Sequence, residues 1–240
     1  MLSTMTALVI IPAFNEEKNL ASVIAEVKTN LPGFDIVVVN DGSIDRTIQI
    51  AASNGAEIVS HPVNIGYGAA VQTGFKYACK KGYNLVVLMD ADGQHDAKDA
   101  SMLVRTLKEQ SADMVLGSRF MVKTGYKTTF ARVVGRNLFS LITYLITHRN
   151  FLDITSGFQA LNGQAVAFLS RNYPVDYPDA EVIIMMLLNG FQIAEAPANF
   201  RQRLNGQSMF SLPKKLYYPF KGLLAILIVV MREIFSKKEK

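Results

Sequence analysis

A short apolar segment that ends in two carboxylates constrains the fold of this chain more than any other feature. Residues 85–89 (Leu-Val-Val-Leu-Met) contain no polar side chain, and Asp90 and Asp92 follow directly. Such a run predicts a strand that is buried on both faces, as in a parallel sheet. The strand would deliver the two carboxylates to the carboxyl edge of the sheet, where open α/β folds bind ligands. The alternative is an acidic turn that Gly93 helps to form.

Strand and helix signals alternate along the first half of the chain. Apolar runs predict strands at residues 7–12, 36–39, 56–60, 85–89 and 114–117. Helical spacing of apolar residues predicts helices at residues 16–31, 46–54, 69–81 and 98–110. This alternation favours βαβ units, and therefore an α/β fold with a mainly parallel central sheet flanked by helices. In the second half we expect helices at 130–147, 163–172 and 180–189 and a late strand at 191–197.

The positive charge of the chain is concentrated at its C-terminal end. Residues 201–240 contain nine Lys or Arg and two Asp or Glu, whereas residues 1–200 contain 16 basic and 18 acidic residues. The apolar side chains between these charges favour an anionic membrane surface over nucleic acid as the partner. The longest uncharged stretch of the apolar segment at 216–235 is residues 222–231, which is shorter than the about 20 residues of a spanning helix. We therefore expect one domain over residues 1–212 and a membrane-surface helix within 213–240. The alternative is a terminal helix that docks on the core.

The cysteine and histidine content narrows the possible chemistry. The single cysteine, Cys79, excludes a disulfide framework within the chain and fits a reducing compartment. Three scattered His and one Cys form no zinc-type cluster. The N-terminus lacks the basic segment and the cleavage site of a signal peptide, so none is expected.

Polar clusters follow three of the predicted strands: residues 12–16, residues 39–47, and the pair Asp90 and Asp92. Because neighbouring parallel strands end at one edge of a sheet, we expect these acidic loops to converge there. Close carboxylates repel one another, and a divalent cation or a polar ligand relieves that repulsion. For the second cluster the alternative is a polar turn in which Ser43 or Asp45 caps the next helix.

The third cluster offers only hard oxygen ligands, namely two carboxylates and the amide oxygen of Gln94. Such ligands favour Mg²⁺ or Mn²⁺, usually shared with substrate phosphates. Asp41, in the second cluster, is placed to hydrogen-bond a ribose or a base edge. The glycines of residues 64–70 allow the backbone to approach a ligand closely, and the N-terminus of the helix that follows can face a phosphate. By itself this is a weak indication of phosphate binding. The chain has no Walker A sequence, and its first strand–helix turn lacks the glycine fingerprint of NAD-binding oxidoreductases.

Taken together, these motifs resemble the family 2 glycosyltransferases with the GT-A fold, and among them the dolichyl- or polyprenyl-phosphate mannose or glucose synthases. The resemblance covers residues 5 to about 212 and rests on seven motifs in family order. These are Pro12–Glu16, Asp41–Thr47, Asn64–Ala69, Asp90–His95, Gly117–Arg119, Ser156–Phe158, and Arg203 followed by Gly206-Gln207-Ser208.

The resemblance implies a role for each matched residue. The donor nucleotide sugar would be held by Pro12, Phe14, Glu16, Val39, Asp41, Ala91 and Arg203, with Arg203 closing over the diphosphate. Mg²⁺ or Mn²⁺ on that diphosphate would be bound by Asp90, Asp92 and Gln94. A lipid phosphate would be bound by Arg119 together with Arg132 or Arg136. Asp90, Asp92 and Arg119 would be the catalytic residues.

Two positions depart from the pattern of the family. Several relatives have a Lys six residues after the loop Arg, where this chain has Met209, so one phosphate-binding cation is missing. Relatives also often have a Pro where this chain has Asp96. For Arg132 and Arg136 the alternative is a solvated helix face.

The expected activity is the inverting, metal-dependent transfer of a hexose from a GDP-mannose or UDP-glucose type donor to a polyprenyl or dolichyl phosphate. It would take place at the cytoplasmic face of a membrane, on a peripheral protein with or without a partner membrane protein. One alternative is a relative that glycosylates a sugar hydroxyl in polysaccharide or glycolipid assembly. That reaction needs a general base, for which Asp179 and Glu181 are candidates. Another alternative is a non-catalytic sensor of nucleotide sugars.

Overall fold

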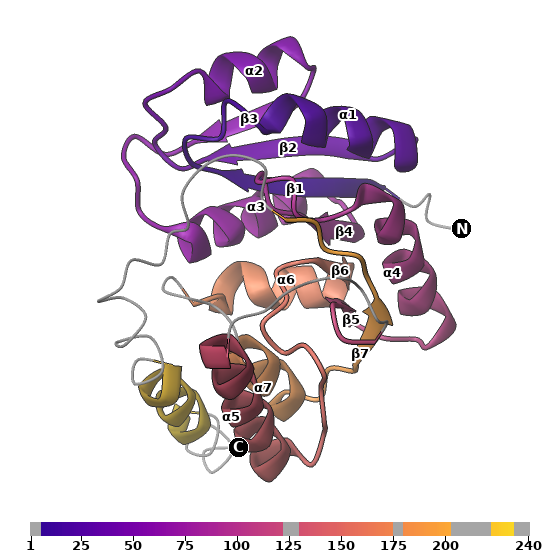
Figure 1. Ribbon diagram of the computed structural model, residues 1–240, viewed down its shortest axis with the longest axis vertical. Coiled ribbons are helices and arrows are strands. Elements are labelled where there is room, and N and C mark those ends of the chain that lie inside the picture. The colour runs from indigo at the N-terminus through magenta and orange to yellow at the C-terminus, as the bar shows by residue number, and fades with distance from the viewer. Residues whose placement is uncertain (1–5, 122–129, 175–179, 203–221, 233–240) are drawn as a thin grey trace.

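The computed structural model describes residues 6–121, 130–174, 180–202 and 222–232 of the 240-residue chain. Their strands form one sheet with the order β3-β2-β1-β4-β6-β5-β7 (Figure 1). The strands are β1 (Ala7–Ala13), β2 (Asp35–Asn40), β3 (Glu57–Ser60), β4 (Leu85–Leu88), β5 (Met114–Ser118), β6 (Gln159–Asn162) and β7 (Ile193–Pro197). The helices are α1 (Leu20–Asn30), α2 (Thr47–Ser53), α3 (Tyr67–Lys81), α4 (Ala97–Glu109), α5 (Phe130–Thr147), α6 (Gly163–Asn172), α7 (Ala180–Leu188) and a last helix at 222–232.

The sheet is parallel except for one strand. Strands β1, β2, β3 and β4 pair in parallel, and so do β5 and β7. Strand β6 is antiparallel to both of its neighbours, β4 and β5. The predicted α/β fold with a mainly parallel sheet is therefore confirmed, and the predicted helices and strands are found within a few residues of their expected bounds. Strand β6 was not predicted.

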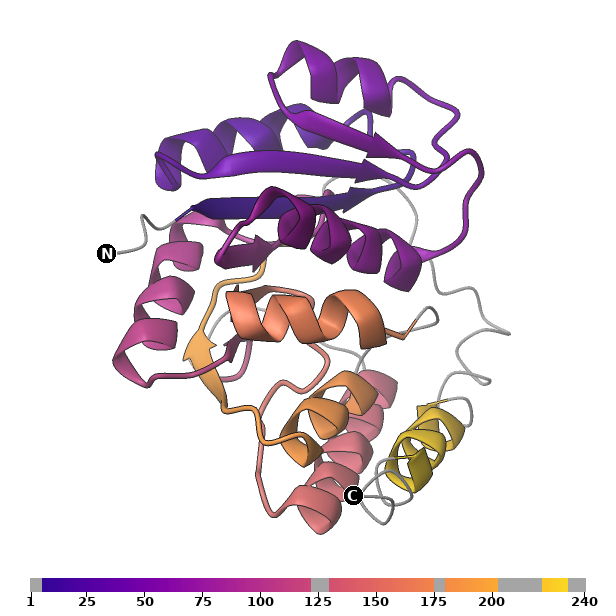
Figure 2. The same cartoon turned by 180° about the vertical axis from the view of Figure 1, so that it is seen from behind.

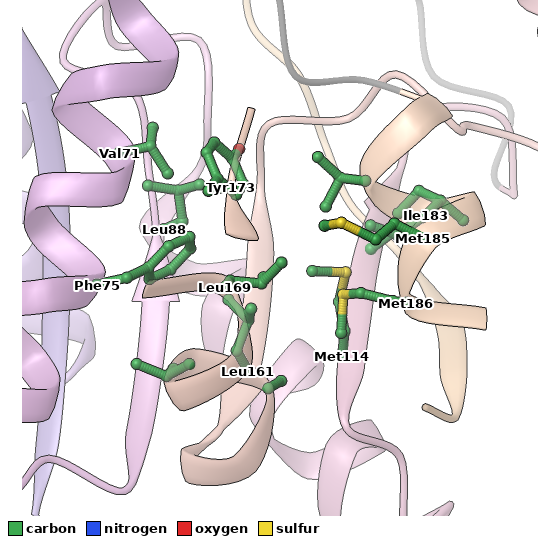
Figure 3. Close-up of a cluster of buried hydrophobic side chains, with 14 of the residues drawn as sticks. Val71, Phe75, Leu88, Met114, Leu161, Leu169, Tyr173, Ile183, Met185 and Met186 are labelled. Atoms are coloured by element: carbon green, nitrogen blue, oxygen red, sulfur yellow. The ribbon is translucent and has the colours of Figure 1, made fainter. Parts of the chain in front are cut away.

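Both faces of the sheet are covered by helices, which explains why its central strands are apolar throughout. Leu8 and Ile10 of β1 face one core cluster, together with α3 and α6, whereas Val9 and Ile11 face the other, together with α1 and α4. Helices α3 and α6 lie side by side in front of the sheet in Figure 2. Figure 3 shows part of the first cluster, in which Phe75 of α3 meets the edge of the Tyr173 ring at 5.3 Å between centroids.

The last helix, at residues 222–232, packs on the domain with one face only. Ile226 and Val229 are buried in the first core cluster. Gly222 lies so close to α5 that a Cβ added there would be 2.7 Å from the Phe139 ring. The opposite face exposes Leu223, Leu224, Leu227, Ile228 and Met231. The helix thus contacts the core through its first face, as the alternative interpretation expects. The predicted boundary at 212/213 lies outside the described residues.

None of the described helices is long and apolar enough to cross a membrane.

One helix is shorter than predicted, and the reason lies in its first turn. Helix α1 begins at Leu20 instead of Glu16. The backbone N–H groups of Asn19 and Leu20 both donate to the Glu16 carbonyl, at 3.1 and 3.0 Å. The Glu16 carboxylate accepts a 2.7 Å bond from the Asn19 side chain. Residues 16–19 therefore form a closed turn at the carboxyl end of β1, directly before the helix.

Candidate active site

The loops after β1 and β2 are bonded to each other at the carboxyl edge of the sheet. The Asn15 N–H donates to Ser43 Oγ, and Asn15 Oδ1 accepts the Ile44 N–H, both at 2.9 Å. Asn15 has a φ of 55°, a conformation that Asn tolerates better than most residues. Beside it, Phe14 is exposed. This pair of loops presents an aromatic ring at the edge where the donor is expected.

The second loop also has the capping role that was weighed against a ligand role. Asp45 Oδ1 accepts the N–H of Thr47, the first residue of α2, at 2.9 Å. Glu16 is tied to the same place, because its N–H donates to Thr47 Oγ1 at 2.9 Å. The turn between β2 and α2 is therefore supported by internal bonds whether or not a ligand is bound.

Asp41 is buried, and its carboxylate binds the segment that precedes α3. Oδ1 accepts the Ile65 N–H at 3.0 Å and lies 2.7 Å from His61 Nδ1, while Oδ2 accepts the Gly66 N–H at 2.9 Å. The adjacent Gly42 has a φ of +71°, and a Cβ there would be 2.4 Å from the Val63 carbonyl carbon. The structure thus assigns Asp41 a positioning contact, and its predicted bond to a nucleoside stays a prediction.

Three further predicted donor contacts are buried. Pro12 and Val39 lie within β1 and β2, and Ala91 belongs to the second core cluster. Apolar residues at the ends of buried parallel strands pack between the sheet and its helices, so these positions support the site from below. Their side chains are buried, and the donor contacts that the resemblance implies for them stay predictions.

The third loop brings Asp90, Asp92 and Gln94 together after β4. Asp90 Oδ1 accepts a 2.9 Å bond from the Tyr67 hydroxyl, and Asp92 Oδ1 accepts the Gln94 N–H at 3.0 Å. The Gln94 side-chain nitrogen donates to the Arg201 carbonyl at 3.3 Å. The amide oxygen of Gln94 is not used in this bond. The three side chains lie on one loop at the carboxyl end of β4, and their role as metal ligands stays a prediction.

These residues fit a hard divalent cation. In the part of the chain that the structure describes, no three side chains of His, Cys, Asp or Glu are grouped so as to hold a metal by themselves. Mg²⁺, however, is usually bound by one or two carboxylates together with substrate phosphates. Two carboxylates and an amide oxygen at the sheet edge are a donor set of that kind.

His95 packs beneath the loop after β4, residues 90–95, which is called the metal loop below because its predicted role is to bind the cation. Its ring stacks on Phe158 at 4.9 Å between centroids and meets the edge of Phe200 at 5.0 Å. Nδ1 accepts the Asp90 N–H at 3.1 Å, so the proton of the neutral ring is on Nε2, which lies 3.6 Å from Asp90 Oδ2. Burial lowers the pKa of His95 to about 4, and the charge of Arg119 acts in the same direction against the opposing charges of Asp92 and Asp153.

Arg119 follows β5 and is held by the loop before β6. Its Nε and Nη2 bind the two carboxylate oxygens of Asp153, each at 2.6 Å, and Nη2 also donates to Thr155 Oγ1 at 3.1 Å. Its guanidinium carbon lies 5.0 Å from the centre of the Phe200 ring. The predicted phosphate-binding arginine therefore has a carboxylate partner that sequence reasoning did not identify.

The Asp153 loop is fixed in turn by β7. Glu195 accepts the N–H groups of Leu152 and Asp153, both at 2.8 Å. Burial raises the pKa of the Glu195 carboxyl, while these two bonds oppose the rise. Neither acidic residue stands in a recognisable motif, so only the fold reveals their connection to Arg119.

Of the other two predicted acceptor residues, Arg132 and Arg136, the structure describes only the side chain of Arg136. The guanidinium carbon of Arg136, on α5, lies 4.0 Å from the centre of the Phe120 ring, and that of Arg119 lies 5.8 Å from it, so the structure brings both arginines to one aromatic side chain. Arg132 is on α5, but its side chain lies outside the described residues, as do Arg203, Met209 and Asp179. Glu181 is buried in the first turn of α7.

Arg201 is a further residue that the sequence did not single out. Its guanidinium bridges Glu26 of α1 at 2.6 Å and Asp96, the N-cap of α4, at 2.8 Å. Its N–H donates to the Gln94 carbonyl at 2.8 Å. Asp96, which departs from the family pattern, thus helps to fasten the chain after β7 to the metal loop.

Comparison with known proteins agrees with this geometry. Residues 8–169 match glycosyl transferase family 2. Polyprenol monophosphomannose synthase of Mycolicibacterium smegmatis is 29% identical over 87% of this chain and 82% of its own length. UDP-N-acetylglucosamine–dolichyl-phosphate N-acetylglucosaminyltransferase of Methanococcus voltae is 30% identical over 78% of this chain and 82% of its own length.

A solved structure shows the same architecture. Glucosyl-3-phosphoglycerate synthase from Mycobacterium tuberculosis, in complex with Mn²⁺, UDP and glucosyl-3-phosphoglycerate, aligns with a TM-score of 0.67 at 22% identity. The alignment covers 95% of this chain and 80% of that one. With a family match that spans more than half of its residues, the chain belongs to glycosyl transferase family 2 and is a glycosyltransferase with the GT-A fold.

Proposed function

We propose that this glycosyltransferase moves a hexose from a nucleotide-diphosphate sugar to the phosphate of a polyprenyl or dolichyl lipid, with inversion at the sugar carbon. One observation carries the proposal: the acidic loop after β4 and Arg119 after β5 stand on either side of a single strand, β6. Gln159 of β6 pairs with Leu88 on one side and with Leu116 on the other. An oxygen-ligand site for a diphosphate thus lies two strands away from a guanidinium that suits a second phosphate.

The donor half of the site is the edge formed by β1, β2 and β4. Asp90, Asp92 and Gln94 would hold Mg²⁺ or Mn²⁺, and the fold relative from M. tuberculosis is in complex with Mn²⁺ and UDP. When bound, such a cation stabilises the negative charge of a leaving diphosphate as a Lewis acid. Phe14 offers an exposed ring beside the same edge. The proposal does not specify the sugar or the base of the donor, because the two relatives are named for different sugars.

The acceptor half is the cationic region around Phe120. A phosphate monoester has a second pKa of about 6 and is mostly dianionic at pH 7, so its oxygen needs no strong base to attack. That oxygen forms a bond to the anomeric carbon while the bond from this carbon to the diphosphate oxygen breaks, and the electron pair leaves with the diphosphate. Arg119 and Arg136 flank the Phe120 ring, where they would neutralise the incoming phosphate.

A lipid acceptor requires that the protein reach a membrane surface. The last helix, at residues 222–232, exposes five large apolar side chains on the face that does not pack on the domain. Helix α5 exposes four more, Leu138, Leu141, Tyr144 and Leu145. The basic residues of the C-terminal 40 positions add attraction to anionic lipid headgroups. We therefore assign residues 213–240 to peripheral binding at the cytoplasmic face, with residues 1–212 as the catalytic domain.

The test is a product assay with a panel of donors and two classes of acceptor. The full-length protein is incubated with GDP-mannose, UDP-glucose and UDP-N-acetylglucosamine, each with undecaprenyl phosphate, dolichyl phosphate or a sugar with free hydroxyls. The proposal expects a lipid-phosphate hexose, identified by mass and cleaved by mild acid. Exclusive glycosylation of the sugar hydroxyls would contradict it.

A further inference from the structure

The carboxylate of Asp90 is enclosed on three sides. The Tyr67 hydroxyl donates to Oδ1 at 2.9 Å, and His95 Nε2 lies 3.6 Å from Oδ2. On the third side is Gly157, where an added Cβ would be 3.2 Å from Oδ2 and 3.1 Å from the Tyr67 hydroxyl oxygen. A side chain at residue 157 would therefore press on both Asp90 and its hydrogen-bond donor. The orientation of the carboxylate is determined by these neighbours.

Tyr67 is itself fixed from another strand end. It is the first residue of α3, and the two residues before it, Ile65 and Gly66, donate their N–H groups to the buried Asp41 carboxylate. Its ring also packs against the first core cluster. A continuous set of contacts thus runs from Asp41 after β2 through the start of α3 to Asp90 after β4.

We propose that Tyr67 is a positioning residue for the metal loop, and that its hydroxyl holds Asp90 in the rotamer that binds the divalent cation. This inference rests on the proposed function, because it needs a cation at Asp90 and Asp92. A hydrogen bond to one oxygen of a ligating carboxylate limits rotation of the group and directs its other lone pairs. Loss of such an outer partner typically weakens metal binding 10- to 100-fold.

The test measures metal binding directly. The probe is Mn²⁺, added to the full-length protein with saturating UDP or GDP, and free Mn²⁺ is followed by electron paramagnetic resonance. Tyr67→Phe keeps the ring and removes only the hydroxyl, so its unfolding temperature should match that of the native protein. The Kd for Mn²⁺ is expected to rise about 10-fold or more. Transfer activity should fall at low Mn²⁺ and recover at high Mn²⁺.

A matched control exists in the same chain. The Tyr83 hydroxyl donates to Asp35 Oδ2 at 2.7 Å, the same kind of bond at the start of β2, at the opposite edge of the sheet. Tyr83→Phe should leave the Kd for Mn²⁺ unchanged. Gly157→Ala gives a second, independent change, because its methyl group would displace Asp90 or Tyr67. It is expected to weaken Mn²⁺ binding as well.

The outcomes separate this inference from the function on which it rests. If the native protein fails to bind Mn²⁺ in the presence of UDP and also in the presence of GDP, the proposed metal site is wrong. The proposed role of Tyr67 is then wrong as well. If the native protein binds Mn²⁺ and Tyr67→Phe binds it equally tightly, the inference is overturned while the proposed function stands. Equal weakening by Tyr83→Phe would also overturn it, because the effect would then not be specific to Asp90.

Discussion

The guanidinium of Arg119 grips the carboxylate of Asp153 through two parallel bonds of 2.6 Å each. Asp153 has no exposed surface, and the Arg119 side chain is 16% exposed. The orientation of the guanidinium is therefore fixed by a buried anion, which occupies its Nε and Nη2. We interpret this pair as the contact that orients Arg119.

Asp153→Asn should destabilise the protein strongly. Removing one partner of a buried ion pair leaves the other charge uncompensated and costs about 3–5 kcal/mol. Urea unfolding of the variant and of the native protein measures the difference. The exposed pair of Arg46 with Glu17, at 3.2 Å, provides the control, because loss of a surface pair costs about 1 kcal/mol or less. Equal effects of Asp153→Asn and Arg46→Ala would show that burial of the first pair contributes nothing.

Arg119→Lys should impair use of the lipid phosphate far more than binding of the nucleotide sugar. Lysine keeps the charge but cannot make the paired bonds to Asp153 that orient the guanidinium. A hydrogen bond to a charged group contributes about 1.5–3 kcal/mol, so a loss of roughly 10- to 150-fold in kcat/KM for the lipid is expected. Nucleotide-sugar affinity is measured without acceptor in parallel. A loss confined to the nucleotide sugar would place Arg119 in the donor site.

Asp92→Asn should keep the fold and lose transfer activity. The residue lies half-buried in a loop at the sheet edge, outside the strands and helices, and Asn has nearly the same size as Asp. Loss of a ligand should cost at least about 100-fold, the upper range for loss of an outer-shell partner. Excess chelator should inactivate the native enzyme, and Mg²⁺ or Mn²⁺ should restore it. Full activity in chelator would refute the metal assignment.

Substitutions on the two faces of the last helix should have opposite consequences. Leu224 and Leu227 are 57% and 54% exposed, so changing both to Gln should leave the unfolding free energy unchanged. Because a buried Leu contributes about 1.5–3 kcal/mol, the pair should lower binding to anionic vesicles by at least about 10-fold. Ile226 is 4% exposed, and Ile226→Ala should instead cost about 2–5 kcal/mol of stability. Unchanged vesicle binding of the double variant would show that this face does not meet lipid.

The metal-free protein should lose stability as pH falls from about 6.5 to about 4. The pKa of His95 is about 4 in the folded chain, against an ordinary value of 6.5. Within that window His95 is protonated in the unfolded chain but neutral in the folded chain, so acid favours unfolding. The free energy of unfolding should fall by about 3 kcal/mol at the lower end of the window. Urea unfolding of the native protein and of His95→Gln across this range isolates the effect. Parallel pH profiles would exclude His95 as its source.

Much of the site was accessible from strand ends alone. The acidic loops after β1, β2 and β4 converge as predicted, because parallel strands that are buried on both faces are apolar runs with polar residues at their carboxyl ends. The donor roles of Val39 and Ala91 come from the family resemblance instead, and they stay predictions. Their neighbours in sequence line the edge, yet their own side chains point into the core.

Other features needed the fold. Strand β6 has only four residues and no alternating pattern, so nothing in Gln159–Asn162 distinguishes it from a loop. Without β6, nothing in the sequence relates Arg119 to Asp153, which lies 34 positions later. The Tyr67 hydroxyl was equally hidden, because the motif at residues 64–69 was interpreted through its glycines. Pairing between distant segments carries no local signal.

The position of β6 between β4 and β5 sets the distance between the loop after β4 and Arg119. Asp90 stands two residues beyond Leu88, and Ser118 two beyond Leu116, while both Leu88 and Leu116 pair with Gln159. Two interstrand spacings, about 9–10 Å in all, therefore separate the metal loop from Arg119 at backbone level. Hydrogen-bonded peptide groups fix that separation, so it does not depend on the side chains that the two loops carry.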